Sequence, residues 1–317
     1  MISIGISIIN FQAAAETARC VDSLTSTANL DASDFRLLIR VADNHSDPAD
    51  FELLQAALSK NVRVSLVRNQ RNLGFAAGHN RNIEWLISRE NPDFIWLLNN
   101  DCVVEAHAPA ALLQCAADRP EVGIWGATLL EGPRGPIQCA GGCRYWPWLS
   151  AFRQNGRGTP LGQLGDMPEA RLDYVAGASL FMPVDTLVSG LAPARGRSRQ
   201  QTGQWLNEEF FLYFEELDLS RRLSPGIQLG WCRQARIVHS GGAGTGSDSS
   251  GRSAKGEYHS TLSALKYTRL YHPAKLWVMA PARLLIKTLF SLVTLRFDLI
   301  RALMAAYGDF FGWLKAK

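Results

Sequence analysis

The stretch Phe94-Ile95-Trp96-Leu97-Leu98-Asn99-Asn100-Asp101 decides the fold of this chain. Its five apolar residues end abruptly at three polar ones, as in a strand that is buried on both faces of a parallel sheet. Open α/β sheets bind ligands at the carboxyl ends of their strands, where this polar cluster would lie. The Asp101 carboxylate beside two amides suits a Mg²⁺ or Mn²⁺ ion that holds a diphosphate. The alternative interpretation is a strand followed by an Asn-rich turn.

Composition indicates a globular protein with one large domain, or one domain and an extension. Of the 317 residues, 47% are hydrophobic and 20% charged, and the net charge of +4 is too small to indicate nucleic-acid binding. The spacing of the six cysteines fits neither a disulfide framework nor a zinc site, which predicts free thiols in a reducing compartment. The first residues predict a strand and not a signal peptide, and we expect no window of about 20 residues to be apolar enough to span a bilayer. A cytoplasmic protein is therefore expected.

Strands and helices alternate along the first half of the chain. This alternation with short connections predicts a parallel, doubly wound sheet, because crossover connections are right-handed. The carboxyl edge of that sheet would carry Asn10, Asp43 and Asp101. A carboxylate after the second strand suits a ribose hydroxyl or a base edge, although a helix cap is the simpler interpretation of Asp43. The sequence predicts strands at 2–9, 35–42 and 62–67, and helices at 13–28, 49–59 and 82–90.

A loop rich in small residues, 68–80, follows the third predicted strand. Gly74 and its neighbouring alanines let a ligand approach the backbone, and the helix that begins after the loop favours phosphate. Arg68 or Arg71 could add positive charge at a diphosphate. The glycine spacing matches neither a dinucleotide-binding fingerprint nor a P-loop.

Two later segments carry aromatic residues. Residues 131–166 are predicted to form a long loop that either covers or lines a ligand site or packs against the sheet. In the second segment Glu215, Glu216 and Asp218 follow a run of mostly aromatic residues. A carboxylate beside apolar surface has a raised pKa and can accept a proton near neutral pH. Acids in the first turn of a helix can also simply oppose the helix dipole, which is the alternative here.

Four motifs, in this order, resemble the family 2 glycosyltransferases, enzymes of the GT-A fold that use nucleoside-diphosphate sugars. The resemblance covers about residues 2–240, and the last motif is the most specific. Asn99 stands where the family usually has an acid, a variant common in its rhamnosyltransferase-like branch. The motifs are Asp43-Asn44, Asn72-Leu73-Gly74-Phe75-Ala76 with Asn80, Leu98-Asn99-Asn100-Asp101, and Phe210-Phe211-Leu212-Tyr213-Phe214-Glu215-Glu216-Leu217-Asp218.

The resemblance implies an inverting transfer of a sugar, with L-rhamnose from dTDP-rhamnose as the best guess. The acceptor would be a hydroxyl of a lipid-linked glycan or polysaccharide in bacterial cell-surface synthesis. Glu216 would be the catalytic base, with Glu215 as the alternative, and Asp101 and His239 would hold Mg²⁺ or Mn²⁺. The alternatives are another UDP- or GDP-sugar, or a non-catalytic sugar-nucleotide or glycan-binding protein. By the same resemblance and position, the donor-binding residues would be Asn10, Asp43, Arg71, Asn72, Gly74, Asn80, Asn99, Asn100 and Gly177.

We expect a GT-A domain over residues 1–257 and a helical extension over 258–317. Within the domain, a nucleotide-sugar half would cover about 1–130 and an acceptor half about 131–257. The Gly/Ser-rich run 240–256 predicts a lid that orders when donor binds. Residues 274–317 carry seven basic and two acidic side chains in an aromatic-rich, amphipathic sequence. This pattern favours peripheral binding to the inner face of the cell membrane, with packing on the core or a homodimer as alternatives.

Overall fold

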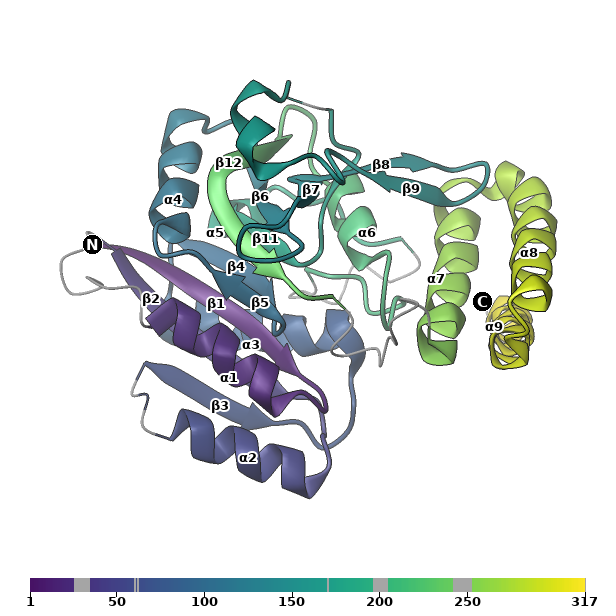
Figure 1. Ribbon diagram of the computed structural model, residues 1–317, viewed down its shortest axis with the longest axis horizontal. Coiled ribbons are helices and arrows are strands. Elements are labelled where there is room, and N and C mark those ends of the chain that lie inside the picture. Colours follow the sequence, from purple (N-terminus) through teal and green to yellow (C-terminus); the bar gives the residue numbers. More distant parts are fainter. Residues whose placement is uncertain are drawn as a thin grey trace.

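A mixed nine-stranded sheet forms the centre of the computed structural model (Figure 1). Its strand order is β3-β2-β1-β4-β11-β6-β12-β5, and β7 pairs with β6 outside this path. The first four of these strands are parallel, as the alternation of strands and helices predicts. The structure describes residues 1–25, 35–59, 61, 63–169, 171–195, 205–241 and 253–316.

In the described part of the N-terminal half, strands and helices alternate as the sequence predicts, except that the short β5 follows β4 directly. Its elements are β1 (Ile2–Asn10), α1 (Ala14–Thr25), β2 (Phe35–Asp43), α2 (Pro48–Leu58), β3 (Val64–Arg68), α3 (Gly74–Glu90), β4 (Phe94–Asn99), β5 (Cys102–Val104), α4 (Ala108–Asp118) and β6 (Val122–Leu130).

Strand β4 is buried on both faces, which explains its uninterrupted apolar sequence. Side chains alternate along a strand, so Trp96 and Leu98 pack in the core cluster that includes α1 and α2. Ile95 and Leu97 pack in a second cluster, which includes α3 on the opposite face. All four are fully buried. Helices on both faces of β4 fix its end, and hence Asp101, at the centre of the carboxyl edge.

Residues 131–166 are not the long loop that their composition predicts. They form strand β7 (Ile137–Ala140), the hairpin of β8 (Gly142–Trp146) and β9 (Ala151–Gln154), and a short helix η1 (Leu161–Asp166). Strand β8 pairs with both β9 and β10 (Tyr174–Val175) in a separate three-stranded sheet. The glycine- and proline-rich composition therefore marks the tight turns of this small sheet.

The second half continues with short elements that lead to the acidic motif. The run 173–183, predicted as one interrupted strand, forms the two strands β10 and β11. The bounds are β11 (Ser179–Pro183), α5 (Val184–Val188), α6 (Glu215–Arg221) and β12 (Gln228–His239).

Three helices follow at one end of the molecule (Figure 1). They are α7 (Ala254–Tyr271), α8 (Leu276–Val293) and α9 (Phe297–Lys315), with a short turn η2 (Pro273–Lys275) before α8. Helix α7 reaches the main core, because its Tyr267 packs in the same cluster as Phe210 and Phe214. Most of the predicted lid, 242–252, lies outside the described residues.

One helix corrects the expectation that no segment is apolar enough to cross a bilayer. By length and composition, Pro273–Val293 meets that condition, with a mean hydropathy of 1.5 and 11% of its apolar window buried. The sequence-based expectation was wrong because Arg283 and Lys287 interrupt the run without making it polar on average. The exposed apolar side chains of α8 are considered again below.

Candidate active site

Parallel pairing brings the polar ends of three strands to one edge of the sheet. Asn10 at the end of β1 lies opposite Asp43 at the end of β2, and Ile9 lies opposite Asn99 of β4. The expected convergence of these residues at the carboxyl edge is therefore observed.

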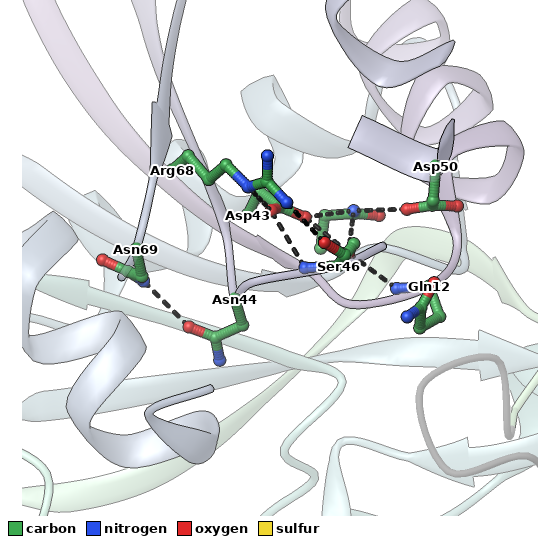
Figure 2. A network of polar contacts seen from close by, with 8 residues as sticks. Gln12, Asp43, Asn44, Ser46, Asp50, Arg68 and Asn69 are labelled. Carbon is green, nitrogen blue, oxygen red and sulfur yellow. Dashed lines mark hydrogen bonds and ion pairs between the residues drawn. The ribbon is translucent and has the colours of Figure 1, made fainter. Parts of the chain in front are cut away.

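Asn10 and Asp43 are fully buried and bind each other, and Figure 2 shows Asp43 with its other partners Ser46 and Arg68. Asn10 Nδ2 donates to Asp43 Oδ1 at 2.8 Å, and the Ser46 hydroxyl donates to the same oxygen at 2.5 Å. Arg68 Nε lies 3.5 Å from Asp43 Oδ2, and Thr17 Oγ1 donates to Asn10 Oδ1 at 2.7 Å. This network fixes the ends of β1 and β2. Direct contact of Asn10 or Asp43 with a donor stays a prediction.

The loop before α3 is shaped by Asn72 and Gly74. Asn72 Oδ1 accepts a hydrogen bond from Gly74 N at 2.9 Å, and Gly74 has a φ of +76°. Phe75 N then donates to Phe211 O at 2.8 Å, which joins this loop to the segment before the acidic helix. Arg71 is exposed on the same loop. The predicted donor loop and the predicted catalytic segment are thus neighbours in space.

Gly74→Ala should destabilise the fold by about 1–3 kcal/mol. A Cβ there would lie 2.3 Å from the Phe211 carbonyl oxygen, and the positive φ also disfavours a side chain. Urea unfolding measures the effect, with Gly132→Ala as the control because a Cβ at Gly132 meets nothing within 4 Å. Equal stability of the two variants would contradict this account of the loop.

Asn80 and Asn100 are occupied by contacts within the protein. Asn80 Nδ2 donates to Leu206 O at 2.9 Å and to Glu208 Oε1 at 3.0 Å, while Leu206 N donates to Asn80 Oδ1. Asn100 Nδ2 donates to Thr17 Oγ1 at 3.0 Å. The structure shows positioning contacts for both amides, and donor binding by either is untested.

Asp101 and His239 meet at the end of β4, and His239 is oriented by Gln138. His239 Nε2 lies 3.3 Å from both Asp101 Oδ1 and Asn99 Nδ2. Gln138 Nε2 donates to the His239 carbonyl at 3.2 Å, so its Oε1 faces His239 Nδ1 at 2.6 Å. Because an amide oxygen only accepts, Nδ1 carries a proton, and in the neutral form of the ring the lone pair is on Nε2. The Nε2 lone pair therefore points toward Asp101.

These side chains form a group that fits a divalent cation. Asp101, Cys102 and His239 each offer one ligand atom, and these atoms lie within 4.8 Å of one another. Burial raises the pKa of Cys102 well above its ordinary value, so the thiol is a poor ligand compared with the carboxylate and imidazole. A donor set of carboxylate and imidazole favours Mn²⁺ over Mg²⁺.

The two glutamates at the start of α6 have different surroundings. Glu215 is buried, and its Oε2 has no hydrogen-bond partner among the residues that the structure describes. Burial, reinforced by the Glu216 charge, raises the pKa of Glu215 well above its ordinary value. Glu216 is half-buried, and desolvation raises its pKa to about 7. Glu216 can therefore exchange a proton near neutral pH, whereas the environment of Glu215 favours its neutral form more strongly.

A turn of small residues separates Glu216 from the metal-ligating group. A Cβ added to Gly177 would lie 3.6 Å from Glu216 Cδ, so the carboxyl group lies close to this glycine. The next residue, Ala178, accepts a hydrogen bond from Asn99 N at 3.0 Å. Residues 177–178 therefore contact both Glu216 and the end of β4, two residues before Asp101.

The backbone before α6 has an unusual conformation. Tyr213 and Phe214 have φ values of +67° and +75°, which residues other than glycine rarely adopt. Ser263 Oγ and Lys266 Nζ, both on α7, donate to the carbonyls of Leu212 and Glu209. Two such residues next to each other cost of order 1–3 kcal/mol each, and such strain is concentrated at functional sites. Helix α7 stabilises the conformation that presents Glu215 and Glu216.

Asp218 is surrounded by partners within the protein. Its Oδ1 accepts from Asn207 Nδ2 at 3.2 Å and from Tyr271 OH at 2.6 Å. Its Oδ2 accepts from Arg222 Nε at 2.6 Å in a buried ion pair. Asp218 thus connects α6 to the end of α7.

Asp218→Ala should lower the free energy of unfolding by about 3–5 kcal/mol, because it leaves the Arg222 guanidinium buried without this carboxylate. Thermal unfolding and circular dichroism measure this loss. Asp298→Ala is the matched control, because its ion pair with Arg296 is exposed and should matter little. A small effect at Asp218 would show that Arg222 finds other partners.

Sequence reasoning missed Gln138, Ser46 and Thr17. Gln138 is separated from His239 by 101 residues, so no local pattern reveals the contact. A polar residue among buried ones in Ile137–Ala140 was the available signal. Ser46 and Thr17 are short polar residues after strand ends, which resemble helix caps in the sequence.

Comparison with known proteins agrees with the fold. Residues 5–135 match the model of Glycosyl transferase family 2. The structure is similar to that of GalNAc-T7 with UDP, GalNAc and Mn²⁺, with a TM-score of 0.54 and 13% identity, over 75% of this chain and 44% of that one. It is also similar to TarS 1–349 of S. aureus, with a TM-score of 0.50 and 9% identity, over 98% of this chain and 80% of that one. No curated protein matches the sequence.

At these identities the structural likenesses establish the fold alone. The fold is a GT-A-like mixed α/β sheet flanked by helices, with helices added at the C-terminus. The match to residues 5–135, together with this fold, supports a family 2 glycosyltransferase.

Proposed function

We propose that this protein is an inverting glycosyltransferase that moves a sugar from a nucleotide-sugar donor to an acceptor hydroxyl. One observation carries the proposal: Glu216 lies beside Gly177, and the next residue, Ala178, is hydrogen-bonded to Asn99, two residues before Asp101 of the Asp101–His239 pair. The turn at 177–178 leaves space beside Glu216 because Gly177 has no side chain. A sugar held there would have a base on one side and a diphosphate site on the other.

Glu216 is the proposed base. Its carboxylate accepts the proton of the acceptor hydroxyl as the oxygen attacks the anomeric carbon and the bond to the diphosphate breaks. With a pKa of about 7, a substantial fraction of Glu216 is ionised at neutral pH. Burial raises the pKa of Glu215 well above its ordinary value, which disfavours its carboxylate form as a second base or nucleophile. One base and no covalent intermediate correspond to a single displacement with inversion.

Asp101 and His239 are the proposed cation ligands. A divalent ion bound there would supply the positive charge that stabilises the leaving diphosphate. Gln138 keeps the His239 ring in the tautomer whose Nε2 can bind an ion. The exposed guanidinium of Arg71 is available to the same diphosphate.

The proposed donor is dTDP-rhamnose, and other UDP- or GDP-sugars are the alternatives. The support is the resemblance of two motif variants, Asn99-Asn100-Asp101 and Glu215-Glu216-Leu217-Asp218, to the rhamnosyltransferase-like branch. We further propose that the acceptor is a lipid-linked glycan, used in cell-surface polysaccharide synthesis. The apolar and basic helices α8 and α9 support a place of action at a membrane surface.

Release of nucleoside diphosphate from a panel of nucleotide sugars, with Mn²⁺ and then with chelator, tests these proposals. We expect the fastest release from dTDP-rhamnose and a loss of release with chelator. If a UDP- or GDP-sugar is preferred, the proposed donor is wrong and the proposed reaction stands. Tight donor binding without release, even with glycan acceptors present, would favour a binding protein.

A further inference from the structure

Helix α8 exposes most of its large apolar side chains and directs its two charged ones toward the protein, although Met279 is buried. Arg283 donates to the hydroxyls of Thr261 and Ser260, and Lys287 Nζ lies 2.7 Å from Glu257 Oε2, all on α7. This is the reverse of a helix that packs on a soluble core. The exposed large side chains of α8 are Trp277, Val278, Leu285, Ile286, Leu289, Phe290, Leu292 and Val293.

The tip of the β8–β9 hairpin carries a second apolar group. Trp146, Trp148, Leu149 and Phe152 are about half exposed or more there, from 48% to 61%. Among the described residues, twenty-one large apolar side chains are exposed, and sixteen of them lie on this tip or within 277–311. Such a concentration exceeds the scattered exposure that is normal for a soluble surface.

The two apolar groups are adjacent. Lys275 Nζ, just before α8, lies 5.1 Å from the centre of the Trp148 ring. Figure 1 shows the hairpin projecting from the main sheet to the ends of α7 and α8. The hairpin is also held at its base, because Tyr145 packs against Tyr267 of α7, with ring centres 5.6 Å apart. We call the hairpin tip together with the exposed side chains of α8 the docking surface.

We propose that the docking surface binds an anionic lipid bilayer, with α8 lying in the plane of the interface and the hairpin tip inserted beside it. Basic residues around the apolar side chains provide the charge complementarity: Lys275 lies between the two groups, and Arg153 and Arg301 are exposed on the flanking β9 and α9. Tryptophan rings favour this depth of a bilayer. Residues 274–317 contain two acidic side chains, and both have partners within the protein. Asp298 pairs with Arg296, and Asp309 accepts a hydrogen bond from Tyr258.

The same contacts favour surface binding over a membrane-spanning α8. If α8 spanned the bilayer, it would leave α7 and carry Arg283 and Lys287 into the hydrocarbon core, which is costly. In the surface arrangement both side chains keep their hydrogen bonds to α7.

The docking surface would place the membrane close to Glu216, the catalytic base of the proposed function on which this inference rests. Tyr145 precedes the hairpin tip and packs against Phe214, which directly precedes Glu215, with ring centres 6.1 Å apart. Strand β8 begins at Gly142 and advances about 3.3 Å per residue. The hairpin tip is therefore only about 10 Å from the first residues of β8. This geometry suits an acceptor whose lipid stays in the bilayer while its polar head reaches Glu216.

Co-sedimentation of the full chain with vesicles tests the docking surface. We expect binding to phosphatidylglycerol-containing vesicles and much weaker binding to pure phosphatidylcholine. W148S/F152S on the hairpin and L285Q/L289Q on α8 should each weaken binding by at least about tenfold, because each withdraws two large apolar groups from lipid. L53Q/V188Q is the matched control, since both residues are exposed but lie on α2 and α5.

Point variants are preferable to removal of residues 274–317. Trp313 of α9 donates to Glu209 Oε2 at 2.8 Å, so truncation would also disturb the segment before the acidic helix. Wild-type binding by W148S/F152S would overturn the role of the hairpin, and equal binding to neutral vesicles would overturn the anionic preference. The wild type could instead fail to bind vesicles and form dimers that the L285Q/L289Q substitutions dissociate. In that case the partner of the docking surface would be a second copy of the chain and not a membrane.

Donor hydrolysis without vesicles separates this inference from the proposed function. W148S/F152S should keep that hydrolysis while losing vesicle binding. A wild-type protein that binds vesicles through both groups but never releases nucleoside diphosphate would refute the transferase proposal and leave the docking surface standing.

Discussion

Glu216→Gln is expected to lower turnover by about 10²- to 10⁴-fold while donor affinity stays near that of the wild type. The amide keeps the size of the side chain beside Gly177 but cannot accept the proton of the acceptor hydroxyl. Single-turnover transfer to an acceptor measures the chemical step, and calorimetry with the nucleoside diphosphate measures binding. A parallel loss of donor affinity would mean that Glu216 holds the donor and is not the base.

The pH profile of the wild type provides a second measure of the same role. The active form of Glu216 is the carboxylate, and its pKa is raised to about 7. Transfer should therefore fall about tenfold per unit as pH drops below about 7, and it should level off above that value. Glu216→Gln should remove this inflection from the residual rate. An inflection near pH 4 in the wild type would indicate a solvated carboxylate and contradict the assignment.

Glu215→Gln is the matched comparison, because the two acids are adjacent and equal in size. Burial raises the pKa of Glu215 well above its ordinary value, and an amide imitates the neutral form that burial favours. We expect turnover within about tenfold of the wild type, far above that of Glu216→Gln. If Glu216→Gln is fully active and Glu215→Gln is inactive, Glu215 is the base and Glu216 is not.

The parts of the fold that the sequence predicted well depend on local patterns. The apolar run at 94–98 is short, continuous and bounded by polar residues, and it forms a strand with two buried faces. The alternation of strands and helices over the first 90 residues leaves few possible topologies, so the carboxyl edge could be located as well. The acidic motif was recognisable because its aromatic residues and its acids are consecutive.

The parts that the sequence did not predict depend on contacts between distant segments. The buried positions of Asn10 and Asp43 follow from Ser46, Thr17 and Arg68 closing around them, which no spacing reveals. Residues 131–166 were misread as a loop because tight turns and loops share glycine and proline. The aromatic residues of that segment gave no sign of their environment: Tyr145 is packed in the interior, while Trp148 is exposed.

Asp101→Asn is expected to remove the metal dependence of donor binding. The change keeps the shape of the side chain and replaces its carboxylate by an amide. That carboxylate is the anionic member of the group, whose other members are the His239 imidazole and the Cys102 thiol. Mn²⁺ affinity should fall by about 100-fold or more, because loss even of a residue that only orients a ligand typically costs about 10–100-fold. Electron paramagnetic resonance of free Mn²⁺ measures this without any turnover, and calorimetry with and without Mn²⁺ measures the effect on nucleoside diphosphate.

Gln138→Leu distinguishes a metal site from a simple hydrogen-bonded pair. Leucine removes the acceptor that keeps the proton on His239 Nδ1, so the ring can adopt the tautomer that points a proton at Asp101. Mn²⁺ affinity should then fall by about 10–100-fold although no ligand has changed. If Gln138→Leu and Asp101→Asn both leave Mn²⁺ binding intact, the ion binds elsewhere. The polar cluster after β4 would then be the strand-end turn that was the alternative from the start.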